Sequence, residues 1–302
     1  MKHIALLILS AALAACGPQI GSLQKGETGR VVRVYNGDTL LLDSGLRVFL
    51  AEVDAPRGKQ AYANQSRAEL EALALNRTVL LAYGGTRRWE RPPSTSAPDT
   101  TTSVASTATT TVTTATTTRA EPTGPLTGQT AIAHVFVETE GGRWFWLQHA
   151  LVGKGAVIVR PRSDNHARTM QLLDVEAQAR AAKRGLWNQR DGRVLTAETA
   201  TRAARSYNKA CMSGQAPYRV LEGTVHEGQA SDTRATLVID GGTAGSPFSV
   251  VVFGDNFAHW DGPVLAGLTG ARIRARGGLG VMDDAPELCL ENGAELQVLR
   301  VH

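Results

Sequence analysis

Hydrophobic positions in the first part of the chain follow two different periods. Residues 31–42 and 46–53 are rich in β-branched and other apolar residues, and the glycine-bearing turn at 43–45 predicts that the two strands form a hairpin. Apolar residues at helical spacing predict a helix over 60–75. The same reasoning predicts strands at 78–83, 131–138 and 156–159, a short helix at 146–152 and a longer helix at 165–184. This order of elements indicates a mainly β fold with α-helices (α+β).

The last third of the chain consists of short β-rich runs separated by glycine-bearing turns. They are expected at 219–225, 235–240, 248–253, 271–276, 287–290 and 295–301. A short helix fits 257–268, between the third and fourth runs. Three strands, a helix and then further strands is the order of an OB-fold. We therefore expect residues 217–302 to form a second, small OB-like β-barrel.

A polar segment interrupts the first of these regions. Residues 92–125 are dominated by Thr with Ala, Ser and Pro, and they hold almost no large apolar side chain. Such a segment cannot bury enough apolar surface to offset the entropy of ordering, so we expect a disordered insertion. Periodic sequence resumes near Gln129, which indicates one interrupted domain over 29–190. Residues 191–216 are then expected to be a linker.

The N-terminus has the pattern of an export signal. The apolar run 4–15 follows Lys2 and is too short to cross a bilayer. Small residues stand directly before Cys16, and this run resembles the bacterial lipobox, in which the cysteine is lipidated. We expect residues 1–15 to be a lipoprotein signal peptide and 16–28 a tether. The protein would then be anchored in a membrane of the bacterial cell envelope and face the periplasm or the exterior.

Two further cysteines, Cys211 and Cys289, would lie outside the cytoplasm, where disulfides persist. A disulfide and two separate buried thiols both remain open. The chain has 32 basic and 28 acidic side chains, a net charge of +4 that becomes +3 without residues 1–15. This mild excess permits an anionic partner, and it also fits a solvated basic surface.

Short motifs exclude several classes of protein. The seven histidines lack metal-ligand spacing, and His134 is expected to be structural. The sequence contains no Cys-x-x-Cys pair, no Walker loop and no Gly-x-Ser-x-Gly elbow. These absences argue against zinc-cysteine sites, P-loop nucleotide hydrolases and α/β-hydrolases.

Two aspartates stand at the ends of expected strands. Asp38 follows Asn36-Gly37 near a bend, and Asp54 ends the next strand before Ala55-Pro56. Carboxylates at neighbouring strand ends can converge on one hard cation, with a backbone carbonyl as a further ligand. Turn chemistry alone also accounts for aspartate at both places, so the pair by itself leaves both interpretations open.

Several dispersed motifs, taken in order, resemble the staphylococcal nuclease (thermonuclease) family. They are Tyr35-Asn36-Gly37-Asp38-Thr39, Leu50-Ala51-Glu52-Val53-Asp54-Ala55-Pro56, Gln60-Ala61-Tyr62 with Gln65-Ser66-Arg67, Ala133-His134-Val135-Phe136, Trp146-Leu147-Gln148 with Ala150-Leu151-Val152, and Glu176-Ala177-Gln178-Ala179 with Arg184-Gly185-Leu186-Trp187. The resemblance covers about residues 29–188 apart from the insertion. It implies an OB-like five-stranded barrel with helices and Ca²⁺-dependent hydrolysis of DNA or RNA phosphodiester bonds. It also implies Asp38, Asp54 and the main-chain carbonyl of Ala55 as Ca²⁺ ligands.

Two catalytic positions of that family carry other residues here. Five residues before Asp54, where the resemblance implies a phosphate-binding arginine, the chain has Phe49. Where it implies the glutamate that activates the attacking water, the chain has Arg57. Arg47 lies on the same strand face as Phe49, about 6.6 Å away, and its long side chain could bridge part of that gap. Glu52 could replace the glutamate, although a solvated strand carboxylate is the interpretation we favour.

The family's second arginine has no counterpart directly before the strand at 131, where Gln129 and Thr130 stand. The segment Arg87-Arg88-Trp89-Glu90-Arg91, upstream of the insertion, resembles the same basic and aromatic pattern. Two interpretations are open. Arg91 is a phosphate ligand, with Arg88 and Trp89 contacting nucleic acid, or the segment is a basic loop beside a linker.

Arginines also alternate along one expected strand of the second domain. Arg272, Arg274 and Arg276 share a face, and the sequence around them resembles the OB-type modules that follow this domain in related bacterial proteins. Such a face can grip nucleic-acid phosphates. A solvent-facing edge strand protected by arginines is the alternative that we favour.

These features predict an exported, lipid-anchored, Ca²⁺-dependent nuclease with DNA or RNA as its partner. Phe49 and Arg57 should make it slow, because losing a general base costs about 10²- to 10⁴-fold and losing a charge-stabilising group about 10²- to 10³-fold. The alternative is a non-catalytic envelope lipoprotein that keeps Ca²⁺ or nucleic-acid affinity on a degenerate nuclease fold.

Overall fold

The computed structural model describes residues 20–85, 87, 126–189, 194–213, 216–243 and 246–299. Cys16, the Thr-rich insertion and the residues Arg88, Trp89 and Arg91 lie outside these ranges, so their predicted roles stay predictions. No helix within the described ranges is both long enough and apolar enough to cross a membrane.

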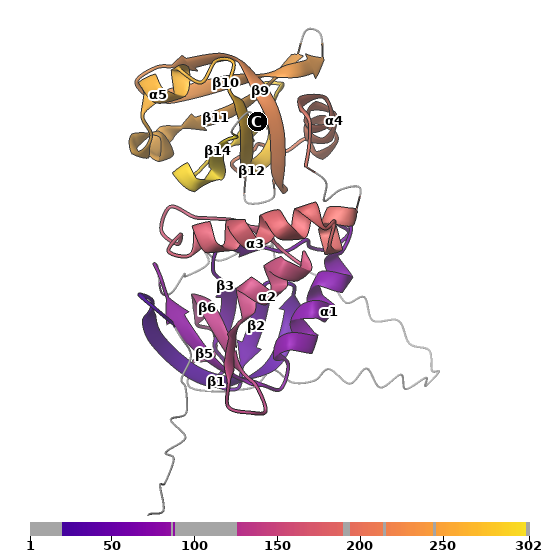
Figure 1. Cartoon of the computed structure of the whole chain (residues 1–302), viewed down its shortest axis with the longest axis vertical. Coiled ribbons are helices and arrows are strands. Elements are labelled where there is room, and N and C mark those ends of the chain that lie inside the picture. The colour runs from indigo at the N-terminus through magenta and orange to yellow at the C-terminus, as the bar shows by residue number, and fades with distance from the viewer. Residues whose placement is uncertain are drawn as a thin grey trace, which may run out of the picture.

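Five strands close the first β-barrel (Figure 1). They are β1 (Gln24–Asn36), β2 (Thr39–Leu42), β3 (Arg47–Leu50), β5 (Thr78–Tyr83) and β6 (Thr130–Glu138). The strand order β3-β2-β1-β5-β6 becomes a ring through the parallel pairing of β3 with β6. Helix α1 (Ala63–Ala74) stands between the third and fourth barrel strands. This is OB-fold connectivity, and the expected OB-like α+β fold is confirmed.

Shorter elements complete the first half of the chain. They are β4 (Val53–Asp54), β7 (Trp144–Trp146), α2 (Leu147–Lys154), β8 (Ile158–Val159), α3 (Thr169–Ala181) and the 3₁₀ helix η1 (Gly185–Asn188). Strand β7 extends the sheet beyond β6, and β4 pairs with β8 outside the barrel. The inward side chains of the barrel strands and the buried faces of the helices share one core, which includes Val48, Leu81, Leu151 and Leu172.

The strand expected over 31–42 is in fact two strands, because the chain reverses at Gly37-Asp38. Asn36 Oδ1 accepts a hydrogen bond from the backbone N–H of Asp38 at 3.0 Å, which is typical of an Asx-turn. A Cβ atom at Gly37 would lie 1.8 Å from Ser66 Oγ of α1. Only glycine therefore lets this turn approach α1 so closely.

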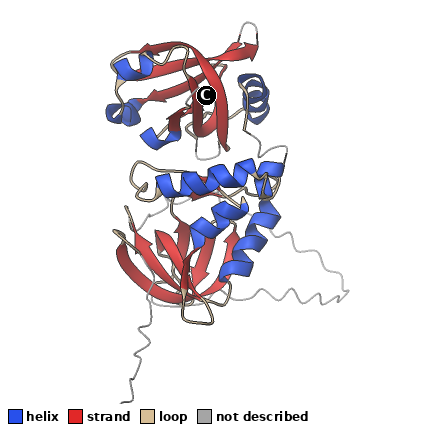
Figure 2. Cartoon of the chain, viewed as in Figure 1, coloured by secondary structure: helices blue, strands red, loops and turns tan. Residues whose placement is uncertain are grey.

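The second β-barrel repeats the connectivity of the first. Its strands are β9 (Tyr218–Ala230), β10 (Arg234–Thr243), β11 (Ser246–Phe253), β12 (Arg272–Met282) and β13 (Ala285–Cys289). The strand order β13-β11-β10-β9-β12 is closed by the pairing of β12 with β13. Between β11 and β12 lie η2 (Gly254–His259) and α5 (Gly262–Ala266), and the last described elements are η3 (Gly293–Glu295) and β14 (Leu296–Val298). Figure 2 shows the strands of each barrel curled together, with helices at the edge.

Helix α4 (Ala197–Tyr207) lies in the segment 191–216, which we expected to be a linker. Its small apolar residues are buried in the core of the second barrel, namely Ala197, Ala200 and Ala204. This part of the segment therefore packs as an element of the second domain. Cys211, a few residues later, forms a disulfide with Cys289, which decides the pairing that the sequence left open.

Helix α3 lies between the two barrels (Figure 1). Arg276 of β12 donates to both carboxylate oxygens of Glu176 on α3, at 3.0 and 3.1 Å, and to the carbonyl oxygen of Val159 at 3.1 Å. The Arg276 side chain is 1 % exposed and that of Glu176 is 0 % exposed. An apolar cluster also joins the two halves, and it includes Ile158, Leu186, Trp187, Tyr218 and Val220. The two halves of the chain thus pack against each other through this ion pair and this apolar cluster, and we call this region the junction.

This junction corrects our interpretation of Arg272, Arg274 and Arg276. Strand β12 pairs with β9 on one side and with β13 and β14 on the other, so it is not an edge strand. Arg276 is buried against α3 and cannot contact nucleic acid. Arg274 forms an ion pair with Glu222 at 2.7 Å, whereas the side chain of Arg272 remains 60 % exposed. The alternation of arginines along the sequence predicted that the three side chains share one face of β12. It did not predict that helix α3 covers the part of this face around Arg276.

Candidate active site

The turn between β1 and β2 holds Asp38 in a buried position. Thr39 Oγ1 donates to Asp38 Oδ1 at 2.9 Å, and the backbone N–H of Ala55 donates to Asp38 Oδ2 at 3.0 Å. The side chain of Asp38 is 4 % exposed. Burial raises the pKa of Asp38, and the positive charge of Arg57 opposes this rise. The aspartate is therefore oriented by local hydrogen bonds before any ligand binds.

Asp54 ends β4, and its backbone pairs with Ile158 of β8. Its Oδ1 atom accepts hydrogen bonds from Arg57 Nη1 at 3.2 Å and from Arg160 Nη1 at 3.3 Å. Its Oδ2 atom accepts no hydrogen bond from the described residues. Since the side chain is 16 % exposed, Asp54 keeps some contact with solvent.

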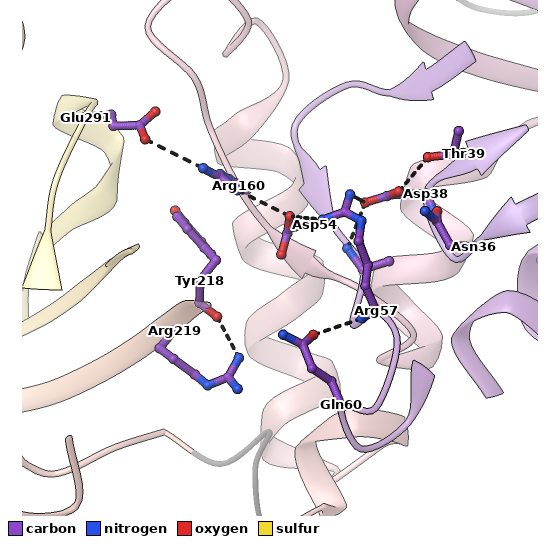
Figure 3. A network of polar contacts seen from close by, with 11 residues as sticks. Asn36, Asp38, Thr39, Asp54, Arg57, Gln60, Arg160, Tyr218, Arg219 and Glu291 are labelled. Carbon is purple, nitrogen blue, oxygen red and sulfur yellow. Dashed lines mark hydrogen bonds and ion pairs between the residues drawn. The ribbon is translucent and has the colours of Figure 1, made fainter. Parts of the chain in front are cut away.

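Arg57 joins the two aspartates (Figure 3). Its Nη2 atom lies 2.6 Å from Asp38 Oδ2, and its Nη1 atom lies 3.2 Å from Asp54 Oδ1. Its backbone N–H donates to Gln60 Oε1 at 2.9 Å, which fixes the loop that carries it. Although burial opposes the effect, the two carboxylates raise the pKa of Arg57. Asp38 and Asp54 thus lie close together, as their strand-end positions predicted, and both form ion pairs with the guanidinium of Arg57.

Arg160 connects this cluster to the second barrel (Figure 3). Besides Asp54, its guanidinium contacts Glu291 Oε1 at 3.6 Å and lies 4.8 Å from the ring centre of Tyr218. The Tyr218 hydroxyl donates to Glu295 Oε1 at 2.7 Å. Burial raises the pKa of Glu295 to about 7. The second barrel therefore helps to position a cation beside Asp54.

A small pocket opens next to these groups, between the two barrels. Its walls come from both halves of the chain and are formed by Asp54, Pro56, Gln60, Ala61, Ile158, Leu186, Tyr218 and Arg219. Arg219 Nη1 donates to the carbonyl oxygen of Tyr218 at 3.0 Å. Asp54 and Arg219 thus place opposite charges on the walls of one pocket.

Phe49 and Arg47 lie on β3 as expected, but Arg47 does not reach the aspartates. Its guanidinium lies 4.6 Å from the ring centre of Tyr35, and Nη2 is 3.4 Å from the Tyr35 hydroxyl. Phe49 stands directly across from Thr39 in the β2–β3 pairing. Because directly paired residues share a sheet face, the side chain at position 49 is on the face of Thr39. Arg47, two residues before Phe49, lies on the same face, and its role as a substitute for the missing arginine stays a prediction.

Glu52 is not the solvated carboxylate that we favoured. It is 2 % exposed, and its backbone has a φ of 63° in the turn between β3 and β4. Its carboxylate lies 3.1 Å from His134 Nε2, accepts the Thr169 hydroxyl at 2.7 Å and accepts the backbone N–H of Arg168 at 2.9 Å. Burial opposes the effect, yet these partners lower the pKa of Glu52. Glu52 holds the start of α3 and has no described contact with Asp38 or Asp54.

The segment proposed to contain a second phosphate ligand is described only at Arg87. That residue pairs with Glu27 at 2.9 Å and lies 4.8 Å from the ring centre of Tyr83. Both contacts belong to the wall of the first barrel. They do not test the prediction that Arg91 binds phosphate.

The family resemblance implies a Ca²⁺ ion at this site. Ca²⁺ takes about six to eight oxygen ligands. Asp38 Oδ2 and Asp54 Oδ1 both already accept hydrogen bonds from Arg57. The charges of Arg57 and Arg160 also balance those of the two aspartates. With Arg57 in this place the residues do not fit a divalent cation, and Ca²⁺ binding through Asp38, Asp54 and Ala55 stays a prediction.

Sequence reasoning missed Arg160, Tyr218 and Glu291. Arg160 directly follows a predicted strand, as Asp54 does, so a strand-end position was available as a signal. No pattern in the sequence connected Tyr218 or Glu291 with the first domain. Only the docking of the two barrels brings these residues to the site.

The site thus consists of paired aspartates and arginines beside a closed OB barrel. Comparisons with known proteins find that part of the chain is similar to proteins named endonuclease. The chain is 34 % identical over 90 residues to a Haemophilus influenzae protein named "Uncharacterized endonuclease", a match that covers 28 % of this chain and 47 % of the relative. An Escherichia coli protein of the same name is 39 % identical over 66 residues, which is 21 % of this chain and 43 % of the relative.

The longest of these matches is to a different protein of Escherichia coli. "Protein ParB" is 27 % identical over 192 residues, covering 62 % of this chain and 88 % of the relative. The chain spans less than half the length of each endonuclease relative. No family model matches the chain.

Proposed function

We propose that this protein is an exported phosphodiesterase of the nuclease class that acts on DNA or RNA, with a staphylococcal nuclease-like barrel as its catalytic domain. The observation that carries the proposal is the convergence of Asp38 and Asp54 beside an OB barrel. Similarity to proteins named endonuclease supports the same class. Guanidinium groups held by carboxylates are well suited to recognise phosphate through charge-assisted hydrogen bonds.

Each group of the site has a proposed role. Arg57, whose side chain is 48 % exposed, binds the phosphate, and Arg160 adds positive charge behind Asp54. Asp54 Oδ2 accepts a proton from the attacking water. The resulting hydroxide adds to phosphorus, one P–O ester bond breaks, the leaving oxygen takes a proton from solvent, and Asp54 returns its proton to solvent. Because Phe49 and Arg57 stand where the family resemblance implies an arginine and the water-activating glutamate, we propose that turnover is slow.

A non-catalytic nucleic-acid-binding protein is the second candidate. Arg57 favours it, because a cation stands where the family resemblance implies the water-activating glutamate. In this case the same arginines would bind phosphate without any hydrolysis.

A cleavage assay on the full-length protein separates the two candidates. We expect slow cleavage of DNA or RNA, and we expect Asp54→Asn to reduce it by about 10²-fold because the general base is lost. Asp43→Asn, in the hairpin turn after β2, is the control and should leave the rate unchanged. Running each reaction with Ca²⁺ and with a chelator tests the metal dependence that the family resemblance implies. Binding without cleavage would favour the second candidate, and neither binding nor cleavage would refute both.

Lipid anchoring is a separate proposal, motivated by the lipobox-like run before Cys16. We expect Cys16→Ser to release the protein from the membrane fraction, because the acylated residue is lost. Fractionation of cells that make either version provides the measurement. Equal membrane association of the two versions would contradict lipidation at Cys16.

A further inference from the structure

The two aspartates of the site already share a cation that belongs to the chain itself. Arg57 Nη2 is 2.6 Å from Asp38 Oδ2 and Nη1 is 3.2 Å from Asp54 Oδ1, so one guanidinium divides its hydrogen bonds between two carboxylates. A divalent ion bound by the same aspartates would lie between these two oxygens. The N–H groups of Arg57 point at the oxygens from that same direction. An ion and this side-chain position exclude each other.

The charge around the aspartates is also already balanced. Arg160 contacts Asp54 at 3.3 Å, so the two aspartates face two guanidiniums. Asp38 Oδ1 and Oδ2 accept further hydrogen bonds from Thr39 and Ala55. Removing both carboxylates from their donors to admit an ion would cost several charge-assisted hydrogen bonds.

The outer side of Arg57 remains available to a ligand. Its side chain is 48 % exposed, although two of its nitrogens are bound to aspartates. Its Nε atom has no hydrogen-bond acceptor among the described residues. An oxyanion can therefore approach the guanidinium from solvent while the aspartates hold it from behind.

We infer that Arg57 is the resident cation of this site. Its guanidinium takes the place of a divalent metal ion between Asp38 and Asp54 and presents its open side to a phosphate group of nucleic acid. The first half of this inference stands on geometry alone, and the second half rests on the proposed function.

Calorimetry with CaCl₂ on the full-length protein tests the first half. We expect no Ca²⁺ binding by the native protein, and binding by Arg57→Gln, because two carboxylates are then left without their shared cation. The double change Arg57→Gln with Asp38→Asn should lose this binding again. Arg67→Gln is the matched control, since Arg67 is 54 % exposed and its described ion pair is with Glu71 on α1. Equal Ca²⁺ binding by the native protein and Arg57→Gln, or none by either, would overturn the inference.

Thermal melting gives an independent readout. The native protein should melt at the same temperature in Ca²⁺ and in EDTA, whereas Arg57→Gln should melt lower in EDTA and recover in Ca²⁺. If Arg57→Gln does not fold in EDTA, refolding in Ca²⁺ supports the inference and failure to refold in Ca²⁺ contradicts it.

Binding of a short single-stranded DNA in EDTA tests the second half. We expect Arg57→Gln to weaken this binding by about tenfold, the loss of roughly one charge-assisted contact, while Arg67→Gln leaves it unchanged. If no form of the protein binds the DNA, the proposed function fails, and the Ca²⁺ measurements still decide whether Arg57 is the resident cation. If the DNA binds native protein and Arg57→Gln equally well, Arg57 is not the phosphate contact.

Discussion

The double change Phe49→Arg with Arg57→Glu is expected to raise the rate of DNA or RNA cleavage in Ca²⁺ by at least about 10²-fold. At position 57 the change removes the guanidinium that occupies Asp38 Oδ2 and Asp54 Oδ1. Both oxygens lose this shared cation, so an ion can approach them, and the new carboxylate can activate water. At position 49 the new arginine stands across from Thr39, whose hydroxyl donates to Asp38. A phosphate-binding group is thus placed on the face that carries the site.

A second double change serves as the control and shows which part of the first one matters. Phe49→Leu with Arg57→Glu should gain Ca²⁺ binding but only part of the rate, because no arginine is added. Initial cleavage rates and Ca²⁺ calorimetry should be measured on the same preparations. If the native protein already cleaves rapidly and the double change leaves the rate unaltered, other residues supply the catalytic groups and the site is not impaired as we propose.

Arg276→Met is expected to lower the free energy of unfolding by about 3–5 kcal/mol, the usual cost of breaking a buried ion pair. The side chains of Arg276 and Glu176 are 1 % and 0 % exposed. Without Arg276, the Glu176 carboxylate keeps the N–H of Val159 as its hydrogen-bond donor, at 2.8 Å, with Arg180 at 3.6 Å. The buried carboxylate would keep only this longer ion pair with Arg180, whose Nε makes no hydrogen bond among the described residues.

Urea denaturation of the full-length protein measures this loss. Arg276→Met with Glu176→Gln should recover most of it, because the amide oxygen still accepts the Val159 N–H and no charge is buried. Nε and Nη2 of Arg276 have no hydrogen-bond partner among the described residues, so removing the whole pair should cost little. Arg272→Met, on the same strand face but 60 % exposed, is the control and should change stability by less than about 0.5 kcal/mol. A loss for Arg276→Met as small as the control's would show that this pair does not stabilise the junction.

Local patterns predicted the barrels well, because the alternation of apolar residues is set by which side of a strand faces the core. The strand boundaries were less predictable. Strand β1 starts at Gln24, whereas the apolar pattern begins at Val31. Its first residues pair with β5 through backbone hydrogen bonds while several of their side chains stay exposed. Backbone pairing of this kind leaves little trace in the side-chain pattern.

Residues of the junction show the limit of such patterns. The alternation placed Arg272 and Arg276 on one face, and the structure has one of them exposed and the other buried against α3. Glu52 was expected in solvent, but α3 and His134 enclose it. A pattern along one strand tells which residues share a face. It does not tell which distant element covers that face.

The sequence by itself determined that this protein has two OB-like barrels and that Asp38 and Asp54 lie at neighbouring strand ends. It did so because strand alternation, turn residues and the position of a helix between strands are local properties of the chain. Tertiary structure alone decided that Arg57 turns inward between the aspartates and that Arg160 reaches Asp54 while held by Tyr218 and Glu291. Long, flexible guanidinium side chains have no fixed direction in the sequence. Their position follows from the carboxylates that the folded barrels bring within reach.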